Sequence, residues 1–424
     1  MSSPAIALLL TGHELMTGDT VDSNSALIAR HLLSQGILVA EKCTVGDDPE
    51  ALRAAITRLS QDHQAVIING GLGPTDDDLT ASIVADLCAA PLIEYPEARA
   101  HVEAWCERRR IRANPANMKQ AWLPTGATLI HNPVGSAVGF ALTLNNCLLL
   151  TTPGVPSELA AMLPAVADSL TATLGGAPAF IRRVQTFGVG ESTVQQWAKE
   201  LGDQWPATVN LGFRAGMPQL ELKLTVANAD EVPDQTRAYE LLEAKFGDHI
   251  LGEGETQLAQ VVQDALKRQC KTLTTAESCT GGLIASMITR EPGSSAVFGT
   301  GFVTYANEAK HSLLAVSHQV LEESGAVSEA VVRQMVLGAL DQSGADIGVA
   351  VSGIAGPDGG TEDKPVGTVW LAWGTREDLR AHCAHIPGSR ALFQQLVAAV
   401  ALDLIRRHLL GLPALPHYFT RQAQ

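Results

Sequence analysis

Continuous apolar runs alternate with amphipathic runs along the first third of the chain. Residues 5–12 (AIALLLTG) and 65–70 (AVIING) are apolar on successive positions and end in glycine, which predicts buried strands followed by loops. Helical spacing of apolar positions predicts helices over residues 23–36, 48–60 and 79–89. Strands that are apolar on both faces and alternate with helices indicate an α/β fold, with a parallel sheet covered by helices in three layers.

The pattern changes twice farther along the chain. Residues 175–179 (GGAPA) read as a linker, and residues 219–226 (QLELKLTV) alternate polar and apolar positions as an antiparallel strand does. After residues 251–256 (LGEGET) the strand and helix alternation resumes. We therefore expect an N-terminal three-layer α/β domain, a small α+β connecting domain and a C-terminal three-layer α/β domain. Their expected bounds are 1–172, 173–252 and 253–415.

Composition and charge restrict the class of protein. The chain has 424 residues, of which 46% are hydrophobic and 18% charged, as is typical of globular domains. Its formal net charge is −15, which disfavours a protein whose main task is binding nucleic acid, because a basic surface supplies most of that affinity. Seven scattered cysteines without a CxxC pair argue against a disulfide framework or a cysteine zinc site. With neither a signal peptide pattern nor a membrane-spanning run, we expect a cytoplasmic protein.

The densest cluster of chemically active residues in the first domain is GGLGPTDDDLT, residues 70–80. Gly71, Gly73 and Thr75 would let backbone N–H groups approach a phosphate, and Asp78 stands in a run of three carboxylates beside them. Glu14 and Asp22 follow the first strand and would lie at the same edge of the sheet. Carboxylates beside a phosphate site can hold Mg²⁺. The alternative is that Asp78 caps a helix and its neighbours are solvated.

A second glycine-rich loop, AESCTGG at residues 276–282, is the first candidate binding segment of the last domain. We interpret its small residues as a cradle for phosphate or ribose. The residues expected to line it are Ser278, Cys279, Thr280, Gly281 and Gly282. Cys279 could instead be a thiol nucleophile if a helix N-terminus lowered its pKa, but no histidine partner is evident and free cysteine is often buried. The segment at 351–361 is again a predicted strand followed by a glycine-rich loop, and it adds Gly353 and Gly356 to the expected pocket. The alternative is that these glycines only satisfy the geometry of a tight turn.

Polar residues surround a predicted strand between these two loops. Ser294 and Ser295 lie before it, and Tyr305, Asn307 and Lys310 lie after it. A serine nucleophile needs a base, and a lysine or tyrosine whose pKa is lowered by partial burial can serve. Read separately, the serines cap a helix and Lys310 is a surface residue.

Taken together, these motifs resemble the CinA family, the competence/damage-inducible protein A family, over essentially the whole chain. The first domain resembles the MoaB/MogA molybdopterin-binding fold through residues 70–80, 117–127, 132–140 and 152–159. The last domain resembles a nicotinamide mononucleotide (NMN) deamidase through TAESCTGGLIA, PGSSAVF, VTYANEAK, GAVSE, SGIAGPDGGT and KPVGTVW. The middle segment, with FGVGES at 187–192, is similar to the connecting domain of the family.

The resemblance implies two activities on products of NAD breakdown. The last domain would hydrolyse NMN to nicotinic acid mononucleotide and ammonia without a cofactor. The first would be an ADP-ribose pyrophosphatase that depends on a divalent metal (Mg²⁺, Co²⁺ or Mn²⁺), with K⁺ as a further candidate. The resemblance also implies a homodimer, small nucleotides as partners, and neither membrane nor direct nucleic acid contact.

The resemblance also suggests roles for single residues. Ser295 would be the nucleophile of the deamidase, with Tyr305 and Lys310 as the base system. Substrate-binding candidates of this domain are Ser278, Cys279, Thr280, Gly281, Gly282, Asn307, Gly353, Gly356 and Arg390. In the first domain Asp78 would be catalytic, with Glu14 and Asp22 as further metal candidates and Gly71, Gly73 and Thr75 at the phosphate. The chain departs from the family at His13, where an acidic residue is common.

Two other classes of function stay open from the sequence. The first domain could be a module that binds a pterin or a nucleotide without turning it over. The whole chain could also act mainly as a partner protein in competence or DNA damage, and salt-dependent DNA binding would test that.

Overall fold

The structure is a computed structural model that describes residues 5–175 and 180–420. The chain divides into two compact units, Met1–Phe180 with Ala227–Asp230, and Ile181–Val226 with Glu231–Gln424. The second unit contains most of the residues of the predicted second and third domains. Most of the predicted linker, residues 176–179, lies outside the described residues. Within those residues, no helix has both the length and the apolar character needed to cross a membrane.

The first unit is built on a six-stranded sheet with the order β2-β1-β3-β8-β7-β6. The first four of these strands run parallel, and β7 and β6 add antiparallel pairs at one edge. The bounds of the strands are β1 Ala5–Thr11, β2 Leu38–Val45, β3 Ala65–Asn69, β6 Thr128–Ile130, β7 Gly139–Leu144 and β8 Cys147–Thr152. The helices are α1 His13–Thr17, α2 Asn24–Ser34, α3 Pro49–Asp62, α4 Thr80–Leu87, α5 Pro96–Arg108, α6 Pro115–Lys119 and α7 Pro156–Leu174.

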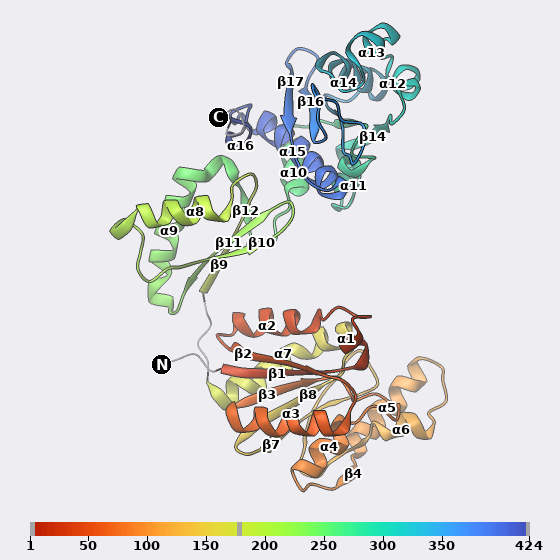
Figure 1. Cartoon of the computed structure of the whole chain (residues 1–424). Coiled ribbons are helices and arrows are strands. Elements are labelled where there is room, and N and C mark those ends of the chain that lie inside the picture. The colour runs from red at the N-terminus through yellow and green to blue at the C-terminus, as the bar shows by residue number, and fades with distance from the viewer. Residues whose placement is uncertain (1–4, 176–179, 421–424) are drawn as a thin grey trace. The chain divides into compact units, whose positions relative to one another are not determined.

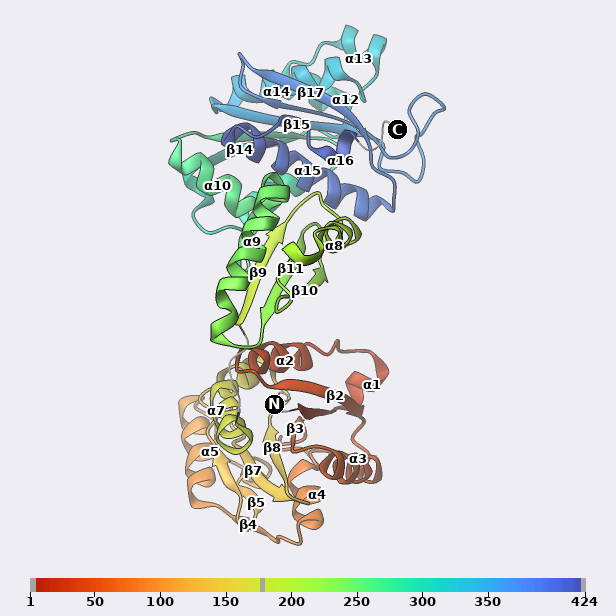
Figure 2. The same ribbon diagram turned by 90° about the vertical axis from the view of Figure 1, so that its left-hand side faces the viewer.

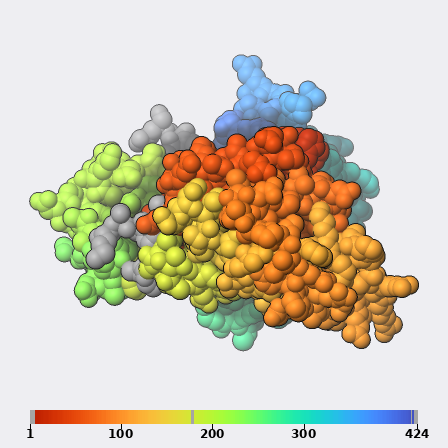
Figure 3. Space-filling view, turned by 90° about the horizontal axis from the view of Figure 1, so that it is seen from below, coloured from red at the N-terminus to blue at the C-terminus, as the bar shows by residue number. Residues whose placement is uncertain are grey.

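Alternate residues of β1 enter two different cores, which gives this unit its three layers (Figure 1). Leu9 packs with Leu52 of α3 and Ile83 of α4 on one face of the sheet. Leu8 packs with Ile28 of α2 and with α7 on the other. The expected three-layer α/β domain is therefore confirmed. A short two-stranded sheet, β4 Leu92–Glu94 with β5 Trp122–Pro124, lies beside α5 and α6, and this segment (orange) is at the surface of the unit (Figure 3).

The second unit begins with a four-stranded sheet in the order β10-β11-β9-β12. Its elements follow the order β-α-β-β-α-β, the split βαβ arrangement. The bounds are β9 Phe180–Thr186, α8 Glu191–Glu200, β10 Asn210–Ala215, β11 Leu220–Val226, α9 Val232–Phe246 and β12 Ile250–Glu253, with 3-10 turns η1 Gly202–Gln204, η2 Ala229–Glu231 and η3 Gly247–His249. The small α+β segment expected from the sequence is present within this unit.

The second unit continues with a five-stranded sheet in the order β14-β13-β15-β16-β17. Helices α10 and α15 cover one face and α12, α13 and α14 the other (Figure 2). The strands are β13 Leu273–Glu277, β14 Phe298–Val303, β15 Ile347–Gly353, β16 Thr368–Gly374 and β17 Leu379–His385. The helices are α10 Leu258–Arg268, α11 Leu283–Thr289, η4 Ser294–Ala296, α12 Asn307–Leu314, α13 His318–Ser324, α14 Glu329–Ser343, α15 Arg390–Leu410 and α16 His417–Thr420.

A buried charge network joins the two parts of the second unit. Asp403, Arg406 and Arg407 of α15 are each at most 1% exposed. Asp403 receives hydrogen bonds of 2.8 Å from both arginines, and Arg407 also reaches the carboxylate of Asp248 in η3 at 3.1 Å. Two cations therefore share two carboxylates, and the second carboxylate comes from the connecting segment. Because an unpaired buried charge is costly, this network holds the connecting segment to α15.

Candidate functional sites

The loop that follows β13 is organised by a buried glutamate. Glu277 accepts hydrogen bonds from the Thr280 hydroxyl at 2.7 Å and from three backbone N–H groups. Those donors belong to Gly282, Ile284 and Ala285, at 3.0, 3.0 and 2.8 Å. Of the groups expected to face a phosphate, the Gly282 amide and the Thr280 hydroxyl are therefore used by Glu277. The sequence interpretation missed this residue, although an acidic side chain at the end of an apolar strand was a visible signal.

Directly after Glu277, Ser278 lies in contact with a buried lysine. The Lys310 Nζ atom is 3.2 Å from the Ser278 hydroxyl oxygen, 2.8 Å from the Thr304 carbonyl oxygen and 3.2 Å from the Tyr305 carbonyl oxygen. Lys310 is 1% exposed and Ser278 is 8% exposed. Burial lowers the pKa of Lys310 below its ordinary value, because a charged amine is poorly solvated there.

The sheet register explains why these residues meet. Strands β13 and β14 run parallel, and Glu277 pairs with Val303. Ser278 and Thr304, the next residue of each strand, therefore leave the sheet side by side. Helix α12 begins at Asn307, so its first turn returns Lys310 to the same point.

Ser295, the predicted nucleophile, lies elsewhere in the domain. It is exposed, in the turn η4 that precedes β14. None of the hydrogen bonds found among the described residues joins it to Tyr305 or Lys310. Lys310 itself is buried, so the alternative that it is a surface residue is wrong.

Tyr305 and Arg390 form a second polar pair at this site. The Tyr305 side chain is 61% exposed, and its hydroxyl accepts a hydrogen bond of 2.9 Å from Arg390. Arg390, the first residue of α15, also donates to the Gly356 carbonyl oxygen at 2.9 Å. The tyrosine hydroxyl is thus paired with a guanidinium, while only the backbone of Tyr305 contacts Lys310. Asn307 is exposed at the start of α12.

Cys279 packs in the interior beside this loop. It is 3% exposed, and burial raises the pKa of its thiol to about 12. The Gln394 side chain donates to its carbonyl oxygen at 2.8 Å, which ties the loop to α15. A thiol with this pKa is protonated at neutral pH, which agrees with a packing role. Gly353 is required for a close approach, because a Cβ there would lie 2.8 Å from the Thr368 carbonyl oxygen.

In the first unit, a cavity of about 530 Å³ opens at the carboxyl ends of the parallel strands. The predicted residues Gly71, Gly73, Asp78 and Glu14 all line it. Asp77, from the predicted run of three carboxylates, also lines it, together with two carboxylates that were not predicted, Asp47 and Glu158. The glycine loop and the acidic residues are therefore brought together as expected.

Hydrogen bonds fix the two sides of this cavity. Asp78 accepts from the Thr75 backbone N–H at 2.8 Å and from the Thr75 hydroxyl at 2.6 Å, and Lys119 donates to the Asp78 carbonyl oxygen at 3.1 Å. A side-chain hydrogen bond between Thr75 and Asp77 lowers the pKa of Asp77. Across the cavity, Asp47 accepts from the Thr11 hydroxyl at 3.0 Å and from the His13 N–H at 2.9 Å. A carboxylate thus lies beside His13, where the chain departs from the family pattern.

Asp22 is not among the cavity residues. Its carboxylate accepts from the Ser25 N–H at 2.9 Å at the start of α2. It therefore binds the first turn of that helix, whose N-cap residue is Ser23. The described residues contain no group of three or more His, Cys, Asp or Glu side chains placed to hold a metal ion.

Gln120 contributes the one buried polar atom of this cavity that lacks a hydrogen-bond partner among the described residues. Its Nε2 atom donates to the Leu72 carbonyl oxygen at 3.1 Å, and its Oε1 atom has no partner. The Leu72 carbonyl oxygen can only accept a hydrogen bond, so the side-chain nitrogen of Gln120 must face it. The side-chain oxygen of Gln120 is therefore the atom left without a partner. Gln120 is 6% exposed, and an unpaired buried acceptor favours a ligand that donates to it.

Comparison with known proteins agrees with this architecture. Residues 255–409 match the model described as the CinA C-terminal domain, and residues 7–172 match the model described as a probable molybdopterin binding domain. The chain thus combines a MoaB/MogA-like domain with a second α/β domain of the CinA type. It belongs to the CinA family. Over its whole length it is 45% identical to a CinA-like protein of Colwellia psychrerythraea, of which 99% is covered.

Two further relatives are informative. A protein of Shewanella oneidensis named nicotinamide-nucleotide amidohydrolase PncC is 37% identical, and the match covers 96% of each chain. A crystal structure of a CinA superfamily protein from Klebsiella pneumoniae is 38% identical, with 36% of this chain and 96% of that chain covered and a TM-score of 0.36. The family therefore includes a protein named for the hydrolysis of a nicotinamide nucleotide.

Proposed function

We propose that the C-terminal part of the chain is an NMN amidase in which Ser278 is the nucleophile and Lys310 the base. The observation that supports this most directly is the set of three neighbours around the Lys310 Nζ atom. A neutral amine has two hydrogens and one lone pair. The carbonyl oxygens of Thr304 and Tyr305 can take the two hydrogens, which leaves the lone pair for the Ser278 hydroxyl. The name of the Shewanella relative supports the choice of substrate.

Burial makes the neutral form of Lys310 accessible. It lowers the pKa of the amine, so the fraction that can accept a proton at neutral pH rises. The same burial keeps the thiol of Cys279, the neighbouring alternative nucleophile, in its protonated form. Of the two candidate nucleophiles in this loop, the serine is the one whose side chain is hydrogen-bonded to Lys310 among the described residues.

The reaction then proceeds in two steps, formation of an ester with Ser278 and hydrolysis of that ester. The Ser278 oxygen attacks the carboxamide carbon of NMN while its proton passes to Lys310. The C–N bond breaks, Lys310 returns the proton to the leaving nitrogen, and ammonia departs from an ester with Ser278. Water then attacks this ester with Lys310 again as the base, which releases nicotinic acid mononucleotide and restores the serine.

The remaining polar groups would hold the nucleotide. Arg390 is a phosphate ligand in this proposal, because its guanidinium is already oriented by Tyr305 and Gly356 and needs little further ordering. Thr280, Gly281, Gly282, Gly353 and Asn307 stay candidates for contacts to the ribose.

Ammonia release from NMN by matched serine variants tests the proposal. We expect Ser278→Ala to lose at least about a thousandfold in kcat/KM and Ser295→Ala to stay within about threefold of the wild type. Full activity in Ser278→Ala would refute the assignment. Loss in Ser295→Ala with retention in Ser278→Ala would restore Ser295 as the nucleophile.

We further propose that the N-terminal domain cleaves the diphosphate of ADP-ribose. The supporting observation is the cavity in which a glycine loop meets five carboxylates. A diphosphate would be repelled by these carboxylates unless cations enter with it. A divalent ion held by Asp78 and Glu14 would supply Lewis-acid polarisation of the diphosphate when bound. Since no complete cage of protein ligands is present among the described residues, we expect the metal to bind together with the substrate.

Gln120 would orient the substrate in this cavity. Its unpaired oxygen would accept a hydrogen bond from a ribose hydroxyl or from the adenine amino group. Turnover of ADP-ribose with titrated Mg²⁺, Mn²⁺ or Co²⁺ tests the activity, and Asp78→Asn serves as the inactive control. Binding of ADP-ribose or a pterin without any metal-stimulated cleavage would mean that the domain is a binding module.

A further inference from the structure

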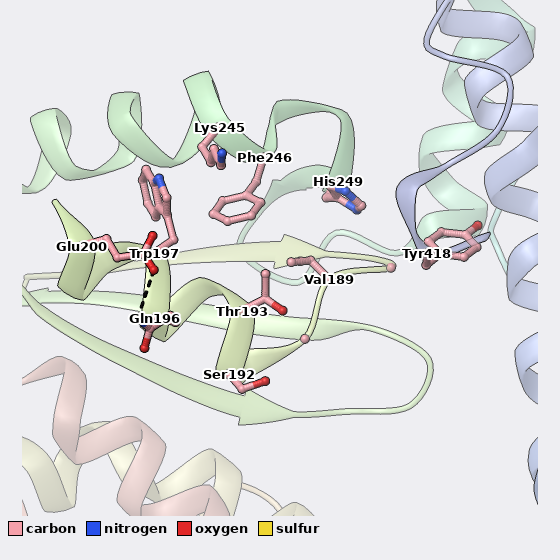
Figure 4. Close-up of a pocket in the computed structure, with 12 residues that line it drawn as sticks. Val189, Ser192, Thr193, Gln196, Trp197, Glu200, Lys245, Phe246, His249 and Tyr418 are labelled. Carbon is pink, nitrogen blue, oxygen red and sulfur yellow. Dashed lines mark hydrogen bonds between the residues drawn. The ribbon is translucent and has the colours of Figure 1, made fainter. Parts of the chain in front are cut away.

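A cavity of about 660 Å³ lies in the connecting segment, apart from both proposed active sites (Figure 4). It is enclosed by the glycine loop after β9, by α8, by the end of α9 with η3, and by Tyr418 of α16. Its residues take no part in either reaction proposed above. The volume lies within the range of ligand pockets, which is about 300–1,000 Å³.

Aromatic rings form one side of this cavity. The rings of Trp197 and Phe246 meet edge to face with centroids 5.1 Å apart, and Phe246 and His249 meet at 6.5 Å. Phe246 and His249 are 6% and 5% exposed, and the Nδ1 atom of His249 lies 2.9 Å from the Phe187 carbonyl oxygen. These rings are therefore held in fixed orientations. Fixed aromatic edges and faces favour a planar ring as the ligand.

Polar side chains from the helix that carries Trp197 also line the cavity. The hydroxyls of Ser192 and Thr193 and the amide of Gln196 come from the first turns of α8 (Figure 4). The formally charged lining residues are one carboxylate, Glu200, and one amine, Lys245. The opposite charges give the lining no net charge, so it suits an uncharged ligand with several hydroxyl groups.

Two glycines of the loop after β9, Gly188 and Gly190, differ in the space around them. Gly188 has φ +75°, and a Cβ there would lie 2.3 Å from a ring carbon of Tyr418, so the loop packs directly on that ring. Gly190 differs, because its φ is −93° and a Cβ there would meet no heavy atom within 4 Å. Gly190 therefore lines the cavity with free space beside its Cα atom, whereas Tyr418 packs against the loop at Gly188.

We propose that this cavity binds a nucleoside. The planar nitrogen heterocycle would lie against Trp197, Phe246 and His249, and the sugar hydroxyls would bond to Ser192 and Thr193. This proposal goes beyond the two activities above and does not depend on either of them.

Gly190 provides a test that leaves the backbone unstrained. Gly190→Trp fills the cavity with a ring, and Gly190→Ala is the matched control that changes the backbone in the same way. Binding of adenosine and nicotinamide riboside to the full chain is measured by calorimetry, with AMP as a further probe that shows whether a phosphate adds affinity. We expect the wild type and Gly190→Ala to bind one nucleoside equivalent more than Gly190→Trp. NMN hydrolysis should be equal in all three proteins, which shows that each is folded.

Two results would overturn the proposal. One is an equal number of bound equivalents in Gly190→Ala and Gly190→Trp, since any binding seen would then come from another site. The other is that none of the three probes binds the wild type. Free adenine lacks the sugar, and we expect it to bind at least about tenfold more weakly than adenosine. Equal affinity for adenine and adenosine would remove the proposed role of Ser192 and Thr193.

Discussion

The rate of NMN hydrolysis should rise with pH because Lys310 must lose its proton to act as a base. Its amine is 1% exposed and lies 3.2 Å from the Ser278 hydroxyl oxygen, and burial lowers its pKa. Below that pKa, kcat/KM should increase about tenfold per pH unit and then reach a plateau. A base in this position contributes roughly a hundredfold to ten-thousandfold to the rate, so Lys310→Met should lose activity on that scale. The assay is ammonia release between about pH 6 and about pH 10.

The same group makes a second, independent contribution that appears in protein stability. Because the folded-state pKa of Lys310 lies below its unfolded value, the unfolded state binds more protons. Stability should therefore rise as pH increases from the folded-state pKa towards about 10.5, the unfolded value. Each unit of pKa depression corresponds to about 1.4 kcal/mol of destabilisation at lower pH. Lys310→Met should lack this slope when the free energy of unfolding is measured by urea titration at several pH values.

Lys310→Arg separates a base from a positive charge. The guanidinium keeps the charge and stays protonated over this range, so a base role predicts loss of activity without a rising pH limb. Activity that falls as pH rises, or an active Lys310→Arg variant, would refute the reasoning and make Lys310 an electrostatic group.

Three other predictions follow from single contacts. Cys279→Ser should retain amidase activity within about threefold, and iodoacetamide at neutral pH should not inactivate the wild type, because the pKa of this buried thiol is about 12. Glu277→Gln should lower the free energy of unfolding by about 3 kcal/mol in urea titrations, since an amide cannot accept all four donors of the loop. Asp22→Ala should cost about 1 kcal/mol of stability through the lost hydrogen bond to the first turn of α2, while leaving ADP-ribose cleavage unchanged. Loss of cleavage would return Asp22 to the metal site.

The three-layer domains could be predicted because their strands are continuous apolar runs. β1 and β3 are buried on both faces, and that burial is directly visible as hydrophobicity along the chain. The pairing of the edge strands was not visible in the same way. β6 has only three residues, from Thr128 to Ile130, and its place beside β7 depends on packing that no local pattern records.

Of the two serines considered for the amidase site, Ser278 is hydrogen-bonded to Lys310, and none of the hydrogen bonds of the described residues joins Ser295 to it. Ser278 and Ser295 both precede Lys310 in the chain, and sequence separation does not show which hydroxyl faces the amine. The register of β13 against β14 determines which hydroxyl faces the Lys310 amine, because it places Ser278 beside Thr304. Asp47 in the first domain was missed for a similar reason, since it follows an exposed edge strand and reaches the cavity only through the loop before α3.

The charge network on α15 has a consequence for how this chain can be divided. A cut between β12 and α10 would separate Arg407 from the Asp248 carboxylate and leave two buried guanidinium groups with the single carboxylate of Asp403. An isolated C-terminal segment of this sequence would thus present, on the face left by the cut, two guanidinium groups that share the carboxylate of Asp403. When domains are exchanged between homologues, Asp248, Arg406 and Arg407 should be transferred together. For recombination, a C-terminal piece that includes the connecting segment keeps this network intact.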